Sequence, residues 1–197
     1  MDTNIYSPPA SILNVKDLPD LGGKTLNSTS YYVVSKRKYF LLFFATIGMY
    51  EFFWFYKNWK LHKIRTGDSS WPVMRAIFPI FFAHSLFEAV DRSLRANGKE
   101  FSWDPRATAT GFVLLQIASS ILDRLSSKNV GSPYTDLLSL ALLPLLGRRI
   151  YIAQQAINIA CGQPNGESNS KLSIANFIWL GLGLIFWVLI IWGLVWA

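Results

Sequence analysis

The chain alternates between long apolar runs and short polar connections. Five apolar segments are long enough for a membrane helix or for most of one, and they cover residues 39–60, 71–90, 107–125, 134–160 and 172–197. Residues 1–35 are rich in proline and glycine and lack apolar periodicity. The pattern therefore predicts an all-α fold, an integral membrane helical bundle of about five hydrophobic segments over 36–197, preceded by a disordered, mostly extended polar tail over 1–35.

The first apolar segment, residues 39–60, is rich in aromatic residues and has basic residues on both flanks. Between Lys38 and Lys57 the only formal charge is Glu51, and a helix of that length rises about 27 Å, close to the thickness of the hydrocarbon core. Basic residues beside such a segment contact anionic headgroups or serve only as a topology signal. The residues expected to contact headgroups are Lys36, Arg37, Lys38, Lys57 and Lys60.

Ionisable and amide side chains recur within the apolar segments at helical spacing. Glu51 shares one face with an amide and an imidazole, and this face is expected to contact protein because a buried carboxylate facing lipid is costly. His84 and Glu88 are four residues apart and would be neighbours on a helix, most simply as a satisfied polar pair. The candidate functional polar residues are Glu51, His84, Glu88, Gln116 and Asp123.

The middle segments carry interruptions that leave their relation to the membrane open. Arg75 and Pro79 interrupt the second segment, which either spans with a buried polar edge or lies along the interface. Pro144 and Gly147 divide the fourth segment. The distribution of basic residues places the N-terminus in the cytoplasm by a small margin. Because the 57–75 connection is also basic, the first or second segment is alternatively interfacial or re-entrant, with a kink near Gly48.

Composition supports the membrane interpretation. The chain is 51% hydrophobic and only 16% charged. This composition gives more apolar surface than a soluble domain of this size could bury. The net charge of +7 is spread between the apolar runs, which favours membrane flanking over nucleic-acid binding. One cysteine, Cys161, excludes an internal disulfide. The first thirty residues lack the apolar core of a signal peptide, so no cleavage is predicted.

Two stretches show a resemblance to known proteins. A T-x-G-x-Y-x-x-x-W-F-Y pattern runs from Thr46 to Tyr56, and the residues 4–10 are similar to the N-P-Y-x-P-P opening of short bacterial membrane proteins, with Ile5 in place of the first proline. The chain thus resembles an uncharacterised family of small bacterial multi-pass inner-membrane proteins, a domain of unknown function. The resemblance implies a location in the bacterial inner membrane, and it implies no activity and no catalytic residue.

Three classes of function fit these patterns. The first is a non-enzymatic accessory or assembly partner in the bacterial inner membrane, whose polar stripes contact other helices. The second is a small transporter or channel component that uses the intramembrane Glu, His, Gln and Asp residues. The third, an intramembrane enzyme, is disfavoured because neither H-E-x-x-H nor G-x-S-x-G occurs. We predict no catalytic residue, cofactor or metal; the expected partners are the lipid bilayer and another membrane protein or a second copy, and not nucleic acid.

Overall fold

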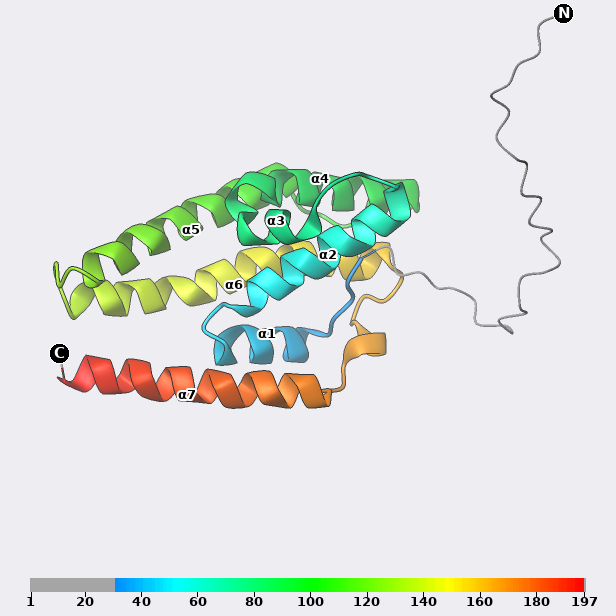
Figure 1. Cartoon of the computed structure of the whole chain (residues 1–197). Helices are drawn as coiled ribbons and strands as arrows, with labels where there is room; N and C mark the ends of the chain where they lie inside the picture. Colours follow the sequence, from blue (N-terminus) through cyan, green and yellow to red (C-terminus); the bar gives the residue numbers. More distant parts are fainter. Residues whose placement is uncertain (1–30, 197) are drawn as a thin grey trace, which may run out of the picture.

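The computed structural model describes residues 31–196, and every regular element in this range is helical. The all-α prediction is therefore confirmed, whereas most of the predicted tail, residues 1–30, lies outside the described residues. Figure 1 shows α7 as one outer layer, α1 beside it, α2 and α6 in the middle, and α3, α4 and α5 on the opposite side. The elements are α1 (Lys36–Ala45), α2 (Tyr50–Thr66), α3 (Pro72–Ile77), α4 (Pro79–Ala96), α5 (Pro105–Ser126), α6 (Tyr134–Ala160), the 3-10 helix η2 (Glu167–Asn169) and α7 (Ile174–Trp196).

The first predicted segment is not one helix, because the chain reverses direction between α1 and α2 (Figure 1). The Thr46 hydroxyl donates to Leu42 O at 2.8 Å and accepts from Tyr50 N at 3.0 Å, so it links the end of one helix to the start of the next. Ile47 and Gly48 both have positive φ, at 52° and 81°, a backbone conformation that ends a right-handed helix. The prediction of a single span over 39–60 is wrong, and the break falls at the alternative kink near Gly48.

The second predicted segment is also divided, at Phe78 and Pro79. Pro79 is the first residue of α4, and the residue before a proline is disfavoured in the helical region. Phe78 accordingly adopts φ −114° and ψ 58° and separates the short α3 from α4. Neither piece could cross a bilayer alone, since α3 has only six residues and the end of α4 carries Asp91, Arg92 and Arg95.

The last two predicted segments form continuous helices. α6 runs through Pro144, and Gly147 lets Phe43 of α1 pack so closely that a Cβ at residue 147 would lie 2.8 Å from its ring. α7 packs mainly against α1, where a Cβ on Gly183 would lie 2.0 Å from Ala45 O and the Trp187 indole donates to Phe44 O at 2.9 Å.

Only α7, over Ile174–Gly193, is long and apolar enough to cross a membrane among the residues that the structure describes. The bundle of about five membrane segments is therefore not supported beyond its helical character. The physical reason lies in the breaks: the turn at residues 46–49 and the interruption at Pro79 divide two apolar runs that composition alone treats as continuous.

Residues 31–35 lie in the protein core as an extended segment, although the sequence assigned them to the polar tail. Tyr31, Val33 and Val34 are buried. Backbone groups in a buried extended segment need partners, and side-chain amides provide them, because Asn158 bonds both N–H and C=O of Val34, at 3.3 and 2.9 Å. Asn58, Gln154 and Asn169 bond the backbone of residues 32 and 33 in the same way.

Candidate functional site

A cavity with a mainly apolar lining lies between α1, α2, α3 and the start of α7, and we call it the lysine cleft. It encloses about 720 Å³, within the range typical of small-molecule sites. Aromatic and aliphatic side chains form most of its wall, and three lysines border it: Lys38, Lys57 and Lys171. No acidic side chain lines it among residues 31–196. Its apolar lining includes Leu42, Met49, Phe52, Phe53, Tyr56, Val73, Ile77 and Trp179.

Lys38 is the most unusual residue of the lysine cleft, because the residue is only 5% exposed and its side chain forms no ion pair in the described structure. Its ammonium donates to Asn169 Oδ1 at 2.6 Å and to Lys171 O at 2.7 Å. Both acceptors are neutral and use two of the three ammonium hydrogens. Burial lowers the pKa of Lys38, since removing an ammonium from water disfavours its charged form. An anion bound beside the Lys38 ammonium would stabilise its charged form.

Glu51 and Gln116 form a second buried polar group, where α2 meets α5. Glu51 is 4% exposed, and its Oε1 accepts from Gln116 Nε2 at 3.1 Å. No cation neutralises this carboxylate in the described residues, and burial raises its pKa to about 8, against the opposing effect of the Gln116 hydrogen bond. The buried Gln116 Oε1 accepts no hydrogen bond. A protonated Glu51 carries the donor that this oxygen lacks, so the pair fits a neutral carboxylic acid.

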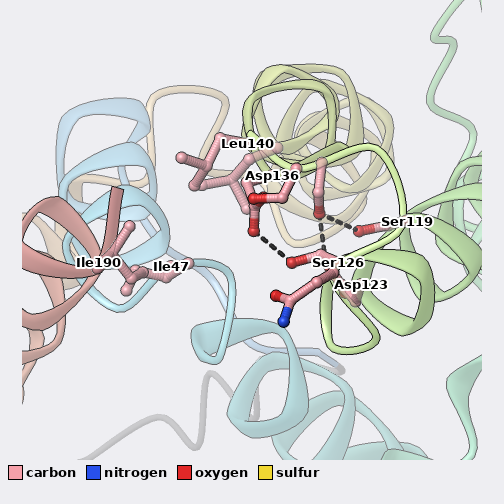
Figure 2. Close-up of a pocket in the computed structure, with 12 residues that line it drawn as sticks. Ile47, Ser119, Asp123, Ser126, Asp136, Leu140 and Ile190 are labelled. Atoms are coloured by element: carbon pink, nitrogen blue, oxygen red, sulfur yellow. Dashed lines mark hydrogen bonds between the residues drawn. The ribbon is translucent and has the colours of Figure 1, made fainter. Parts of the chain in front are cut away.

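A second cavity, of about 450 Å³, lies at the tip of the α5–α6 hairpin beside the last turns of α7 (Figure 2). Asp136 accepts hydrogen bonds from Ser126 and Ser132, and Asp123 accepts one from Ser139. The two serine hydroxyls lower the pKa of Asp136 because they stabilise its charged form. These hydroxyls hold both carboxylates within the hairpin, so the cluster joins α5 to α6.

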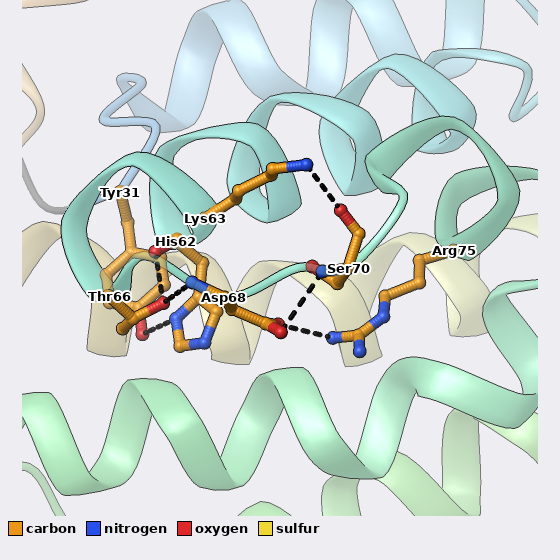
Figure 3. A network of polar contacts seen from close by, with 7 residues as sticks. All are labelled: Tyr31, His62, Lys63, Thr66, Asp68, Ser70 and Arg75. Carbon is orange, nitrogen blue, oxygen red and sulfur yellow. Dashed lines mark hydrogen bonds and ion pairs between the residues drawn. The ribbon is translucent and has the colours of Figure 1, made fainter. Parts of the chain in front are cut away.

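A third polar network closes the end of α2 (Figure 3). Tyr31 OH is hydrogen-bonded to His62 Nδ1 at 3.2 Å and accepts from Arg65 Nη2 at 3.0 Å. Asp68 pairs with Arg75 at 3.5 Å. Burial, together with the charge of Arg65, lowers the pKa of His62 and so favours the neutral imidazole. These contacts join the extended segment 31–35 to the end of α2, and the loop after α2 to α3.

The structure brings together two of the five candidate polar residues, Glu51 and Gln116, and separates the others. His84 Nε2 is bonded to Thr110 Oγ1 at 3.0 Å. Glu88 instead pairs with Arg106 at 2.7 Å and Arg92 at 3.9 Å, so the two do not hydrogen-bond to each other in the described structure. Asp123 lies at the hairpin tip. The five candidates therefore line no common path.

Among the basic residues expected at headgroups, Lys38 and Lys57 line the lysine cleft. Lys36, Arg37 and Lys60 are exposed. Sequence reasoning missed Asn169, Lys171 and Trp179, which come from the polar connection after α6 and the start of α7. Their only sequence signal was a lysine just before the most apolar segment and a tryptophan in its first two turns, a pattern typical of a membrane interface.

Chemically, the described residues offer charged and apolar groups that can bind a ligand. No group of three His, Cys, Asp or Glu side chains among residues 31–196 could hold a metal ion. The lysine cleft combines an apolar wall with fixed positive charge, which suits an anionic amphiphile. Comparison of the chain with protein-family models, curated proteins and solved structures gave no match, so any functional assignment depends on these contacts.

Proposed function

We propose that this chain is a non-enzymatic membrane protein, anchored by α7, that acts as an accessory or assembly partner in the bacterial inner membrane. One observation carries the proposal: α7 has an apolar surface of membrane-spanning length that the rest of the described chain leaves almost entirely exposed. A core helix of a soluble protein would bury that surface, whereas lipid would cover it at no cost.

The position of α7 extends the proposal to the α5–α6 hairpin. α7 lies along the bundle, and its last turns reach the hairpin tip at the cavity that contains Ile190 and Asp123 (Figures 1 and 2). The outer faces of the hairpin are also apolar in this half, with Leu114, Ile117, Ile121, Leu137 and Leu138 exposed. These faces would contact lipid or a partner helix beside α7, which supports an accessory role better than an independent anchor.

The basic residues indicate an orientation. Lys36, Arg37 and Lys171 cluster where α1 and α7 begin, and α7 carries no charge after Ile174. By the positive-inside rule this end faces the cytoplasm. The transporter alternative is less well supported, because Glu51 and Gln116 are paired away from His84, Glu88 and Asp123.

The anchor is tested by alkaline extraction of membranes that contain the full chain. The wild-type protein should stay in the membrane pellet. The double variant Leu184→Lys with Leu189→Lys places charges on exposed positions of α7, and each charge near a bilayer centre costs about 3 kcal/mol on insertion scales. It should move to the soluble or aggregated fraction. Ile64→Lys, at an equally exposed position of α2, is the matched control and should stay in the pellet.

Release of the wild-type chain by alkali would contradict the anchor. The accessory role needs a separate measurement, the mass of the protein in mild detergent. We expect a defined complex with a second protein or a second copy. A monomer in several mild detergents would contradict that part of the proposal and leave the anchor intact.

A further inference from the structure

We propose that the lysine cleft binds one anionic phospholipid, with the phosphate near Lys38, Lys57 and Lys171 and an acyl chain along the apolar wall. The proposal rests on the membrane location given above. It adds a ligand and a site to that function, and the geometry of the cleft supports it independently of the exposed surface of α7.

The first argument is charge. The three lysines belong to the start of α1, the middle of α2 and the residues just before α7, and all three line the cleft. Lys38 is buried, has only neutral acceptors and keeps one ammonium hydrogen free of them. Lys57 lies over the Phe53 ring at 5.5 Å and is not in an ion pair within the described chain. An anionic phosphate would supply the charge that the cleft lacks.

The second argument is the apolar wall. Phe52, Phe53 and Val73 line the cleft and are more than a third exposed, although each is large and apolar. Trp179 of α7 faces the same space and is also exposed. A volume of about 720 Å³ is sufficient for a lipid-sized apolar ligand. An acyl chain would cover the parts of these side chains that the described chain leaves exposed.

The third argument is depth. Lys171, Ser173 and Asn176 line the cleft where the apolar part of α7 begins. If α7 crosses the bilayer, this end of the cleft lies at headgroup level and its apolar wall extends toward the hydrocarbon. The charged and apolar parts of the cleft are therefore arranged in the order in which a phospholipid presents its own phosphate and acyl chains.

Native mass spectrometry of the full chain in detergent tests this site, with phosphatidylglycerol, phosphatidylcholine, laurate and inorganic phosphate as separate probes. We expect one phosphatidylglycerol per chain, bound more tightly than phosphatidylcholine. Lys57→Met should weaken phosphatidylglycerol binding about fivefold, as expected for one lysine near an anionic headgroup. Lys128→Met, at the exposed hairpin tip, is the matched control and should bind like the wild type.

A second variant addresses the apolar wall without removing a buried contact. Val73→Trp fills the cleft from a position that is 45% exposed, so it should fold and lose phosphatidylglycerol binding. Lys38→Met is less informative, because it also removes the hydrogen bonds to Asn169 and Lys171.

Equal binding of both phospholipids, an unchanged affinity in Lys57→Met, or full binding by Val73→Trp would each overturn the proposal. Tighter binding of laurate or inorganic phosphate than of phosphatidylglycerol would do the same. These results would leave the membrane anchor intact if the chain resists alkaline extraction. Conversely, selective phosphatidylglycerol binding by a chain that alkali releases would support the site and contradict the anchor.

Discussion

Glu51 provides the sharpest prediction about the stability of the fold. Its carboxyl is buried, has a single hydrogen-bond donor in Gln116 and no cation beside it in the described residues. Burial raises its pKa from 4.5 to about 8. In the unfolded chain the group returns to its ordinary pKa, so the folded chain binds the proton more tightly. Stability is therefore complete below about pH 4.5 and falls as the pH rises toward 8.

The size of this effect follows from the pKa. One pH unit of differential proton binding corresponds to about 1.4 kcal/mol. The fold therefore loses about 3 kcal/mol of stability by pH 7, because the unfolded chain ionises at Glu51 while the folded chain keeps the proton, and about 5 kcal/mol above the folded pKa. Glu51→Gln removes the titration and keeps a donor for the unpaired Gln116 Oε1. We expect this variant to be about 3 kcal/mol more stable than the wild type at pH 7.

The assay is chemical unfolding of the full chain in one detergent from pH 5 to pH 9. The difference between wild type and Glu51→Gln should grow with pH and level off above pH 8. Glu100→Gln, at an exposed position, is the matched control and should follow the wild type. Parallel curves for wild type and Glu51→Gln over the whole range would refute the assignment of a buried proton to Glu51.

Two further predictions concern the contact between α1 and α7 and the hydrogen bonds to the extended segment 31–35. Gly183→Ala should separate α7 from α1, because its Cβ would lie 2.0 Å from Ala45 O. The expected result is a lower melting temperature and altered Trp187 fluorescence. The control Gly181→Ala, whose Cβ would meet nothing within 4 Å, should change neither. Equal effects of the two variants would contradict the observed α1–α7 contact. Asn158→Ala should destabilise the fold by about 2 kcal/mol, because it leaves the buried N–H and C=O of Val34 without partners. Hydrogen exchange at the Val34 amide should accelerate. The control Asn165→Ala, in an exposed loop, should leave that exchange unchanged.

Local pattern was sufficient to predict some elements. The predicted segment 134–160 coincides with α6, Tyr134–Ala160, and 107–125 lies within one residue or two of α5. The expectation that the Glu51 face contacts protein is confirmed, since Glu51, Phe55 and Asn58 are buried. These results depend on helical periodicity and burial, which repeat along the chain and can be recognised without knowing the fold.

Other features depend on contacts between distant residues. The turn at Ile47 has positive φ at a β-branched residue, a conformation that composition does not reveal. The pairing of Glu51 with Gln116 joins residues 65 positions apart, and the lysine cleft joins α1, α2, α3 and α7. Hydropathy indicated that each residue was unusual within its own segment, but it could not indicate which residues would meet.

The most direct test of the membrane account is cysteine accessibility in intact cells. In a chain with Cys161→Ala, single cysteines replace Thr66, Val130, Asn165 and Gly193, and a membrane-impermeant reagent labels them before and after permeabilisation. We predict that positions 66 and 165 share one side and that position 193 lies on the other, and position 130 tests whether the tip of the α5–α6 hairpin also reaches that other side beside α7. Positions 165 and 193 on the same side would contradict a crossing by α7, and positions 66 and 165 on opposite sides would require a crossing between them, within α3 to α6.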